Sequence, residues 1–576
     1  MGDVPDFANI ISCYGAIVGT GSEAFTAHEP EMIALIDQAG EFMFDCKNIA
    51  RRLKMDRPRR GLPQVSNDSA CSLYLVPSSR AMADAMAKLY WQSFESTHRI
   101  LHAPTFWPDY HRYWDYPEIV ENELRFKVLL VIAIGSSLFD HEDSNAALRN
   151  MELVRPWIHA AESWLAGPLE KDRLSVGGLQ VYCLSILARQ IFSIGGDLMW
   201  MSMGSLMNKA IQIGLHRDPK HLPSVSLLES EIRRRLWATI LDLAVQASLD
   251  VWMPPRISLD GFDTEAPSNL NDDELNGSAL ESPPHPRTVF TTTSTQLALF
   301  DSFPVRLRIV QLLNDLHSKP SYTAVLAISA ELTKALQTIS NLGTTDTIGH
   351  STTPSMTAFH HSLLDYLVRR FMIPLHYFYS HQARSNPLFH SSVKLSLDAA
   401  FALVSPEADP SGEFTQLMTT GGGLFREGFR CAISALGLEL LTHVSAQQQN
   451  GTLHRVLQHR ELLKGAVRNL IAVSEKRICH GETNVKSHMF LNMILAQVEA
   501  VETGIEIKLA IARSTTDSLR VCREILSKIA EAFLHAGELE MAGAVEVEEV
   551  TPGSLESENY VMNWDWDIFL PTSDFS

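Results

Sequence analysis

Paired cysteines are missing from this chain. Its 576 residues include 7 cysteines, which stand singly along the sequence, and no two of them form a C-x-x-C pair. Zinc clusters and zinc fingers need closely spaced thiolates, and a disulfide framework needs an even set of cysteines. The sequence therefore predicts no zinc module, no disulfide scaffold and no bound cofactor. The dispersed thiols indicate a reducing compartment.

Long apolar runs and export signals are missing as well. The most apolar run, V-L-L-V-I-A-I at Val128–Ile134, is far shorter than the roughly 20 residues that span a bilayer. The first residues, M-G-D-V-P-D-F, carry no basic charge of the kind that opens a secretory signal. We therefore expect no membrane partner, and we expect a buried core helix at Val128–Ile134.

Established catalytic motifs do not occur in the sequence, which has no G-x-S-x-G, no H-E-x-x-H and no phosphate-binding loop. In N-D-D-E-L-N-G, Asp272 and Asp273 resemble the aspartate-rich box of helical terpene synthases, but Asn276 stands where a further carboxylate is needed. We therefore predict that the protein is not an enzyme, has no catalytic or metal-binding residues, and uses these acids to solubilise a loop. A magnesium-dependent helical lyase or cyclase stays as the alternative.

Basic charge is scarce and concentrated in one place. The chain has 48 Lys and Arg against 67 Asp and Glu, a net charge of −19. An acidic chain is repelled by phosphate backbones, so contact with DNA needs a local basic patch. One such run, K-N-I-A-R-R-L-K-M-D-R-P-R-R, predicts a nuclear import signal or a weak DNA or anion contact; the alternative is a solvated helix face ending at Pro58. Its basic residues are Lys47 and the six that form the predicted patch, Arg51, Arg52, Lys54, Arg57, Arg59 and Arg60.

Helical periodicity fills most of the chain and predicts an all-α fold. Ser226 and Glu229 form a capping-box pattern at the start of a helix over 226–252, and an apolar stripe follows it. The R-R-R triplet of this helix has acids four residues before it, Glu229 before Arg233 and Glu231 before Arg235. The pattern predicts that the triplet is neutralised within its own helix and does not read DNA.

The chain divides into three parts by pattern. We expect a poorly ordered segment over 1–84, one large helical domain over 85–535 whose motifs lie within 85–350, and a tail over 536–576. The Pro267–Thr295 stretch, rich in Gly, Ser, Thr and Pro, is predicted to be a loop within the domain.

The tail is acidic and aromatic. From Glu538 to the last residue it holds ten Asp or Glu and no Lys or Arg. Acidic charge keeps such a segment solvated, while Trp564, Trp566 and Phe569 can enter a groove on a partner. The composition is typical of an activation segment that recruits the transcription machinery. The alternative is a tail that folds back on its own domain.

Several short motifs in a fixed order carry a resemblance to a known family. They are the His-x-Pro-Thr-Phe turn, the R-R-R-L-W helix and the W-M-P-P turn, with His102, Pro104, Phe106, Arg233, Arg234, Arg235, Trp237 and Pro254. Together they resemble the helical regulatory domain, or middle homology region, of fungus-specific transcription factors. The resemblance implies a nuclear transcription regulator of a fungal gene set, with a secondary-metabolite biosynthetic cluster as the expected target; a homodimer stays open, and so does a helical protein-interaction scaffold as the alternative function.

One departure from the family pattern concerns DNA. In that family a binuclear zinc cluster reads the operator, and this sequence holds no such module. Two interpretations stay open. Either the chain reaches DNA indirectly, through a DNA-binding partner protein, or a zinc module is encoded upstream of Met1.

Overall fold

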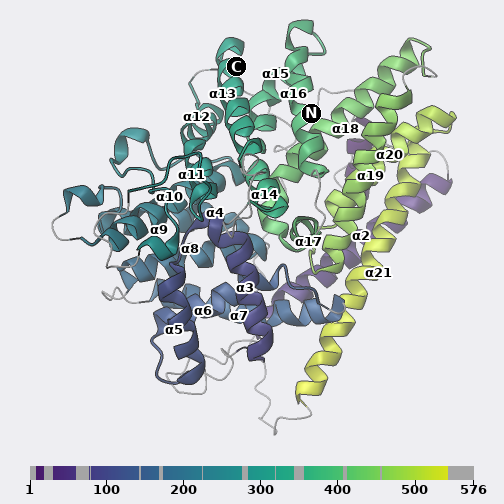
Figure 1. Cartoon of the computed structure of the whole chain (residues 1–576). Coiled ribbons are helices and arrows are strands. Elements are labelled where there is room, and N and C mark those ends of the chain that lie inside the picture. Colours follow the sequence, from purple (N-terminus) through teal and green to yellow (C-terminus); the bar gives the residue numbers. More distant parts are fainter. Residues whose placement is uncertain are drawn as a thin grey trace, which may run out of the picture. The chain divides into compact units, whose positions relative to one another are not determined.

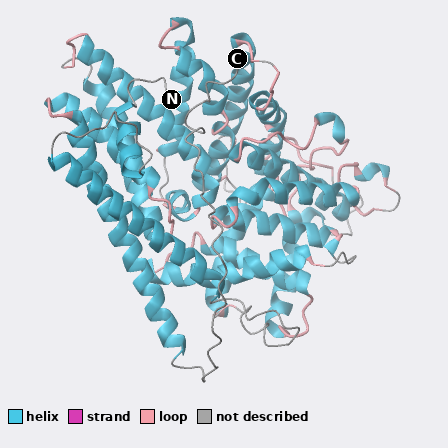
Figure 2. Ribbon diagram, turned by 180° about the vertical axis from the view of Figure 1, so that it is seen from behind, coloured by secondary structure: helices cyan, strands magenta, loops and turns pink. Residues whose placement is uncertain are grey.

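The computed structural model describes residues 8–18, 30–59, 77, 79–141, 144–167, 173–222, 225–275, 283–317, 319–342, 356–405, 412–453 and 457–541. Within its helices, the side chains of residues 54–59, 144, 145, 147, 197 and 533–541 lie outside the description. All regular structure in these ranges is helical, and no strand occurs in them (Figure 2). The prediction of an all-α fold is confirmed. None of the described helices is both long and apolar enough to cross a membrane.

The helices group into two compact units. One unit joins residues 1–56 to residues 436–576, and the other comprises residues 57–435. The division falls within two long helices, α2 (Pro30–Arg59) and α18 (Gly422–Gln449). It differs from the single domain expected over 85–535, because local patterns do not reveal that the first and last parts of the chain fold together.

The unit of residues 57–435 carries the family motifs. Its α-helices are α3 (Arg80–Tyr90), α4 (Ser96–His98), α5 (Ala103–Asp115), α6 (Asn122–Ser136), α7 (Ser144–Ala166), α8 (Val176–Ile191), α9 (Met199–Gln212), α10 (Leu227–Asp250), α11 (Ser294–Asp301), α12 (Phe303–Leu313), α13 (Tyr322–Ser340), α14 (Ala358–Arg369), α15 (Met372–Gln382), α16 (His390–Val404), α17 (Glu413–Thr420) and the first part of α18.

The apolar run at Val128–Ile134 forms the buried centre of α6. Each of its residues is at most 1% exposed, which confirms the predicted core helix. α6 packs against α3 and α8. Gly135 permits the close approach to α3, because a Cβ at this position would lie 1.8 Å from the Met86 carbonyl oxygen.

α10 begins as the sequence predicts, but it is not amphipathic. Ser226 is the N-cap, and its hydroxyl accepts a hydrogen bond from the Glu229 N–H at 3.1 Å. Every residue from Leu236 to Leu249 is buried, whichever side of the helix it occupies. A helix buried all round lies inside its domain, so its polar side chains must find partners within the protein.

The other unit contains α1 (Ala8–Val18), α2, the last part of α18, α19 (Leu457–Cys479), α20 (Lys486–Thr503) and α21 (Ile507–Met541). α20 packs against α19 and α21, and Figure 1 shows the three helices side by side. α1 packs against α20 and α21.

Two helices therefore stand where the sequence predicts a poorly ordered segment over 1–84. α2 is fixed by α21: the Cys46 thiol donates to the Leu519 carbonyl at 3.8 Å, and the Thr516 hydroxyl donates to the Leu35 carbonyl at 3.0 Å. Cys13 of α1 is fully buried. These partners lie more than 450 residues away along the chain, which is why the local pattern does not indicate them.

Candidate functional site

The three arginines of the R-R-R triplet leave α10 toward three different partners. Arg233 donates to the Ile213 carbonyl, beyond the end of α9, at 2.8 Å. Arg234 and Arg235 each reach a separate carboxylate that lies in a loop. Neither predicted i,i+4 pair forms a direct ion pair: Glu231 pairs with Arg234 at 2.9 Å, and Arg235 is bound elsewhere. Burial lowers the pKa of Arg233 and of Arg235, although Glu229 and Glu231, respectively, act in the opposite direction.

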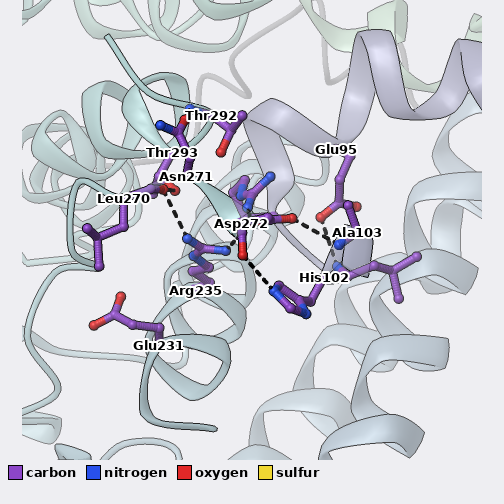
Figure 3. Close-up of polar contacts among 12 residues, drawn as sticks. Glu95, His102, Ala103, Glu231, Arg235, Leu270, Asn271, Asp272, Thr292 and Thr293 are labelled. Atoms are coloured by element: carbon purple, nitrogen blue, oxygen red, sulfur yellow. Dashed lines mark hydrogen bonds and ion pairs between the residues drawn. The ribbon is translucent and has the colours of Figure 1, made fainter. Parts of the chain in front are cut away.

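Arg235 belongs to a buried cluster centred on Asp272 (Figure 3). Oδ1 of Asp272 accepts from Arg235 at 2.7 Å and from Arg99, while Oδ2 accepts from the Ala103 N–H at 2.9 Å. Arg235 also donates to the Leu270 carbonyl at 3.2 Å, and the His102 ring lies 3.1 Å from the Asp272 carbonyl oxygen. One carboxylate thus joins α4, α5 and α10.

The prediction that Asp272 solubilises a loop is therefore wrong: the residue is 8% exposed. Its neighbour Asp273 is exposed. Both oxygens of Asp272 are occupied by cationic or N–H donors, whereas a magnesium ligand must offer its oxygens to the ion. This geometry gives no support to the lyase alternative. No group of three or more His, Cys, Asp or Glu that could hold a metal occurs in the part of the chain that the structure describes.

Glu95 extends this cluster into α3. Its carboxylate accepts from the Tyr90 hydroxyl at 2.6 Å and from the Leu101 N–H at 2.8 Å. Burial raises the pKa of Glu95 to about 7, although Arg99 and the Tyr90 hydrogen bond act in the opposite direction. Burial, together with Arg235 and Arg99, lowers the pKa of His102 to about 4, so this ring is neutral at pH 7.

Arg234 belongs to a second cluster, centred on Asp218. Its guanidinium forms two hydrogen bonds to the Asp218 carboxylate, at 2.9 and 3.0 Å. Asp218 also accepts from the N–H groups of Lys220 and Glu265, both at 2.9 Å. Burial alone would raise the pKa of Asp218, but these hydrogen bonds outweigh it and hold the pKa well below its usual range.

The stretch 267–295, predicted as a loop, is mostly a loop in its described parts, with a 3-10 turn at Asp272–Leu275 and the start of α11 at Ser294; side-chain hydrogen bonds fix its course. The Asn269 amide donates to the Pro286 and Val289 carbonyls, both at 2.9 Å. Its carbonyl oxygen accepts from the Thr291 hydroxyl at 2.7 Å and from the Ser294 hydroxyl at 3.1 Å. This one buried side chain fixes the chain that presents Leu270 and Asp272 to Arg235.

Further polar residues continue along α10 at helical spacing. Thr239 donates to the His98 carbonyl, Asp242 pairs with Arg306 at 2.5 Å, and Gln246 donates to the Leu367 carbonyl at 3.0 Å. Asp250 pairs with Arg370. A polar stripe thus lies inside the helical core, and each member named here has a partner.

The remaining family-motif residues also make packing or hydrogen-bond contacts within the protein. Pro104 stands in the first turn of α5, and Phe106 is buried with its ring 5.5 Å from that of Trp91. Trp237 is fully buried, 5.7 Å from the ring of Phe262. Pro254 is exposed, and its carbonyl accepts from the Trp200 indole at 3.1 Å.

The predicted basic run lies mostly on α2. Arg51 and Arg52 are exposed. Lys54, Arg57 and Arg59 belong to the helix, but their side chains, and the whole of Arg60, lie outside the described residues. The tail residues Trp564, Trp566 and Phe569 also lie outside them.

The sequence did not indicate that Asp218, Glu95 and Arg99 belong to these clusters. The only available signal was an excess of arginine in α10 over its own nearby acids. That signal calls for remote carboxylates, but it does not identify them.

Comparison with known proteins places this arrangement in a family. Residues 87–364, which hold the two clusters, match the fungal specific transcription factor domain. The chain is 47% identical over 612 aligned residues to transcription factor asR3 of Sarocladium schorii, covering 100% of this chain and 72% of that protein. The chain belongs to the fungal specific transcription factor family. The predicted resemblance is confirmed, and with it the prediction of a transcription regulator.

Other members of the family match over shorter parts. Transcription factor opdR of Penicillium oxalicum is 32% identical over 84% of this chain and 63% of that protein. The aspyridones cluster regulator apdR of Emericella nidulans is 34% identical over 57% of this chain and 46% of that protein. No solved structure matches the chain.

Proposed function

We propose that this chain regulates transcription of a secondary-metabolite gene cluster from within the nucleus, with residues 85–535 as its regulatory part. The observation that carries the proposal is the 47% identity to transcription factor asR3 along the whole chain. A further relative bears the name of a cluster regulator. Deleting the gene should lower or raise the transcripts of one limited gene set; an unchanged transcriptome under inducing conditions contradicts the proposal.

The buried clusters support a regulatory rather than a catalytic role. Asp218 and Asp272 are saturated by guanidinium and N–H donors. A general base or a nucleophile must keep an oxygen available to a substrate, which neither carboxylate does. The clusters instead hold the helices and loops of the domain in one arrangement, whose surface partners can recognise.

Promoter choice, in this proposal, comes from a DNA-binding partner protein or from a zinc module joined to this chain. A chain with net charge −19 and one short basic run neutralises few phosphates. Its own affinity for duplex DNA should be non-specific, with a Kd on the order of 10⁻⁴–10⁻⁶ M at physiological salt. Fluorescence anisotropy with the target promoter and a scrambled duplex measures this directly. Nanomolar preference for the promoter by the 576-residue chain contradicts the partner model.

The acidic-aromatic tail is the part proposed to recruit the transcription machinery. Residues 538–576, tethered to an unrelated DNA-binding domain, should activate a reporter gene. The triple variant Trp564→Ala, Trp566→Ala, Phe569→Ala should abolish that activation, because it keeps the acidic charge and removes the apolar anchors. An inert wild-type tail refutes this role.

A further inference from the structure

Unpaired basic side chains gather on one face of α2. Lys47, Arg51 and Arg52 are exposed, and none forms an ion pair with a described side chain. Phe44 is 64% exposed, and it lies three and seven residues before Lys47 and Arg51, so the three share one helix face. The exposed acid Glu41, three residues before Phe44, lies on the same face, so three cations and one anion surround the ring. This net positive face with an exposed ring is suited to a ligand that is both acidic and aromatic.

A groove runs beside this face, between α2 and α21. Its volume is about 700 Å³, and buried Ile49, 6% exposed, gives it an apolar floor. Arg523 is fixed inside it by Asp45 at 3.4 Å, with its guanidinium 4.3 Å from the centre of the Phe42 ring. Arg52 on α2 and Lys528 on α21 line it without an acidic partner among the described side chains.

The groove is lined by three acids and three bases. Asp45 pairs with Arg523; of the charges without an ion-pair partner in the described part of the chain, α2 contributes Arg52, whereas α21 contributes Lys528 together with Glu524 and Glu531. Burial lowers the pKa of Lys486 to about 8, and the charge of Lys47 on α2 adds to the effect. An acidic ligand should therefore lie along α2.

A ligand of this chemistry is joined to the same unit. Beyond Met541 the chain continues for 576 − 541 = 35 residues, which include eight acids and no Lys or Arg. Lys528 stands only 541 − 528 = 13 residues before Met541, or about 20 Å along the helix. The 35 residues can extend to roughly 115 Å, so they can reach the α2 face without strain.

We propose that residues 542–576 fold back onto the exposed face of α2 and the adjoining groove. The acids of the tail then lie against Lys47, Arg51 and Arg52, and Trp564 and Trp566 pack on Phe44 and the apolar floor of the groove. The docked tail makes the basic run inaccessible to other proteins, and the basic run makes the tail inaccessible in the same way. One consequence rests on the proposed function: nuclear import and recruitment of the transcription machinery are blocked together until a partner displaces the tail.

Carbodiimide cross-linking of the full chain, followed by mass spectrometry, tests the docking. The reagent joins a carboxylate to a lysine amine that it touches, so Lys47 and Lys528 report contact with tail acids such as Asp565 and Asp567. We expect both lysines to be linked to the tail. Arg51→Glu with Arg52→Glu leaves both reporters in place and should reduce these links about tenfold, because two favourable contacts become repulsive.

Lys334→Glu with Lys394→Glu is the matched control: it makes the same change in charge at exposed residues of α13 and α16, and should leave the links unchanged. Trp564→Ala with Trp566→Ala should weaken the links without altering any described helix. Tail links spread evenly over all exposed lysines, or no tail links at all, overturn the proposal. Links found only between isotopically distinct chains show docking on a second copy and overturn the fold-back. The tethered reporter assay is independent, so it fails only if the activation role is wrong.

Discussion

The chain carries two groups of neighbouring arginines with opposite fates. On α10, Arg234 and Arg235 have side chains 15% and 1% exposed, and both are bound to carboxylates. On α2, Arg51 and Arg52 are exposed and have no ion-pair partner among the described side chains. The two groups differ because segments distant in the sequence place the carboxylates of Asp218 and Asp272 beside the arginines of α10. A buried, paired arginine shapes the domain, whereas an exposed, unpaired one stays available to an anionic partner.

The largest effect should come from breaking the Asp272 cluster. Arg235→Ala leaves the Asp272 carboxylate buried beside Arg99 with one cationic partner fewer, and should cost about 3–5 kcal/mol of stability. Urea unfolding followed by far-UV circular dichroism measures this, since it reports on the helices of both units. Arg51→Ala is the matched substitution and should change stability by less than about 0.5 kcal/mol. Equal losses in the two variants contradict the comparison.

Asp218→Asn should give the next largest effect, and one that depends on pH. The folded pKa of Asp218 is lowered, so its ionised form stabilises the fold above the unfolded value of about 3.9 and loses that stabilisation as pH falls through the folded pKa. We expect a loss of about 2–3 kcal/mol at pH 7 that shrinks below about pH 4. Exposed Asp260→Asn serves as the control. A loss that is constant from pH 7 to pH 3 contradicts the assignment.

A smaller effect should follow from removing the cap of α10. Ser226→Ala leaves the Glu229 N–H without its acceptor and should cost about 1 kcal/mol, because the helix end is exposed and water replaces part of the bond. Ser230→Ala, one turn further on, should not be destabilising. If both variants unfold at the wild-type urea concentration, the cap contributes nothing.

The smallest change in stability is expected for a double variant of α2, which should nevertheless strongly change where the protein accumulates in the cell. Arg51→Ala with Arg52→Ala should change the free energy of unfolding by less than about 0.5 kcal/mol, and yet reduce nuclear accumulation of a fluorescent fusion. Lys334→Ala with Lys394→Ala controls for loss of exposed charge. An unchanged distribution of the α2 variant favours a solvated helix face over an import signal.

The two arginine groups also show what sequence can predict. The all-α fold, the buried run at Val128–Ile134 and the cap at Ser226 follow from patterns within one helix, where partners stand a few residues apart. The arginines of α10 were correctly assigned to structure, but their partners were not, because Asp272 lies 37 residues from Arg235 and Arg99 lies 173 from Asp272. Pairing between residues so far apart in the sequence is set by tertiary packing, which produces no periodic pattern in the sequence. The same limit explains why the packing of α1 and α2 against the last part of the chain was missed.

The most direct test of the account is the reactivity of individual arginines in the folded chain. Phenylglyoxal modifies accessible guanidinium groups, and mass spectrometry locates each one. A chain ending at Met541 keeps every described helix and removes the tail as a cover. We expect Arg51 and Arg52 to react quickly, and Arg99 and Arg235 to react only when the protein unfolds. Reaction of Arg235 at the rate of Arg51 under native conditions contradicts the account.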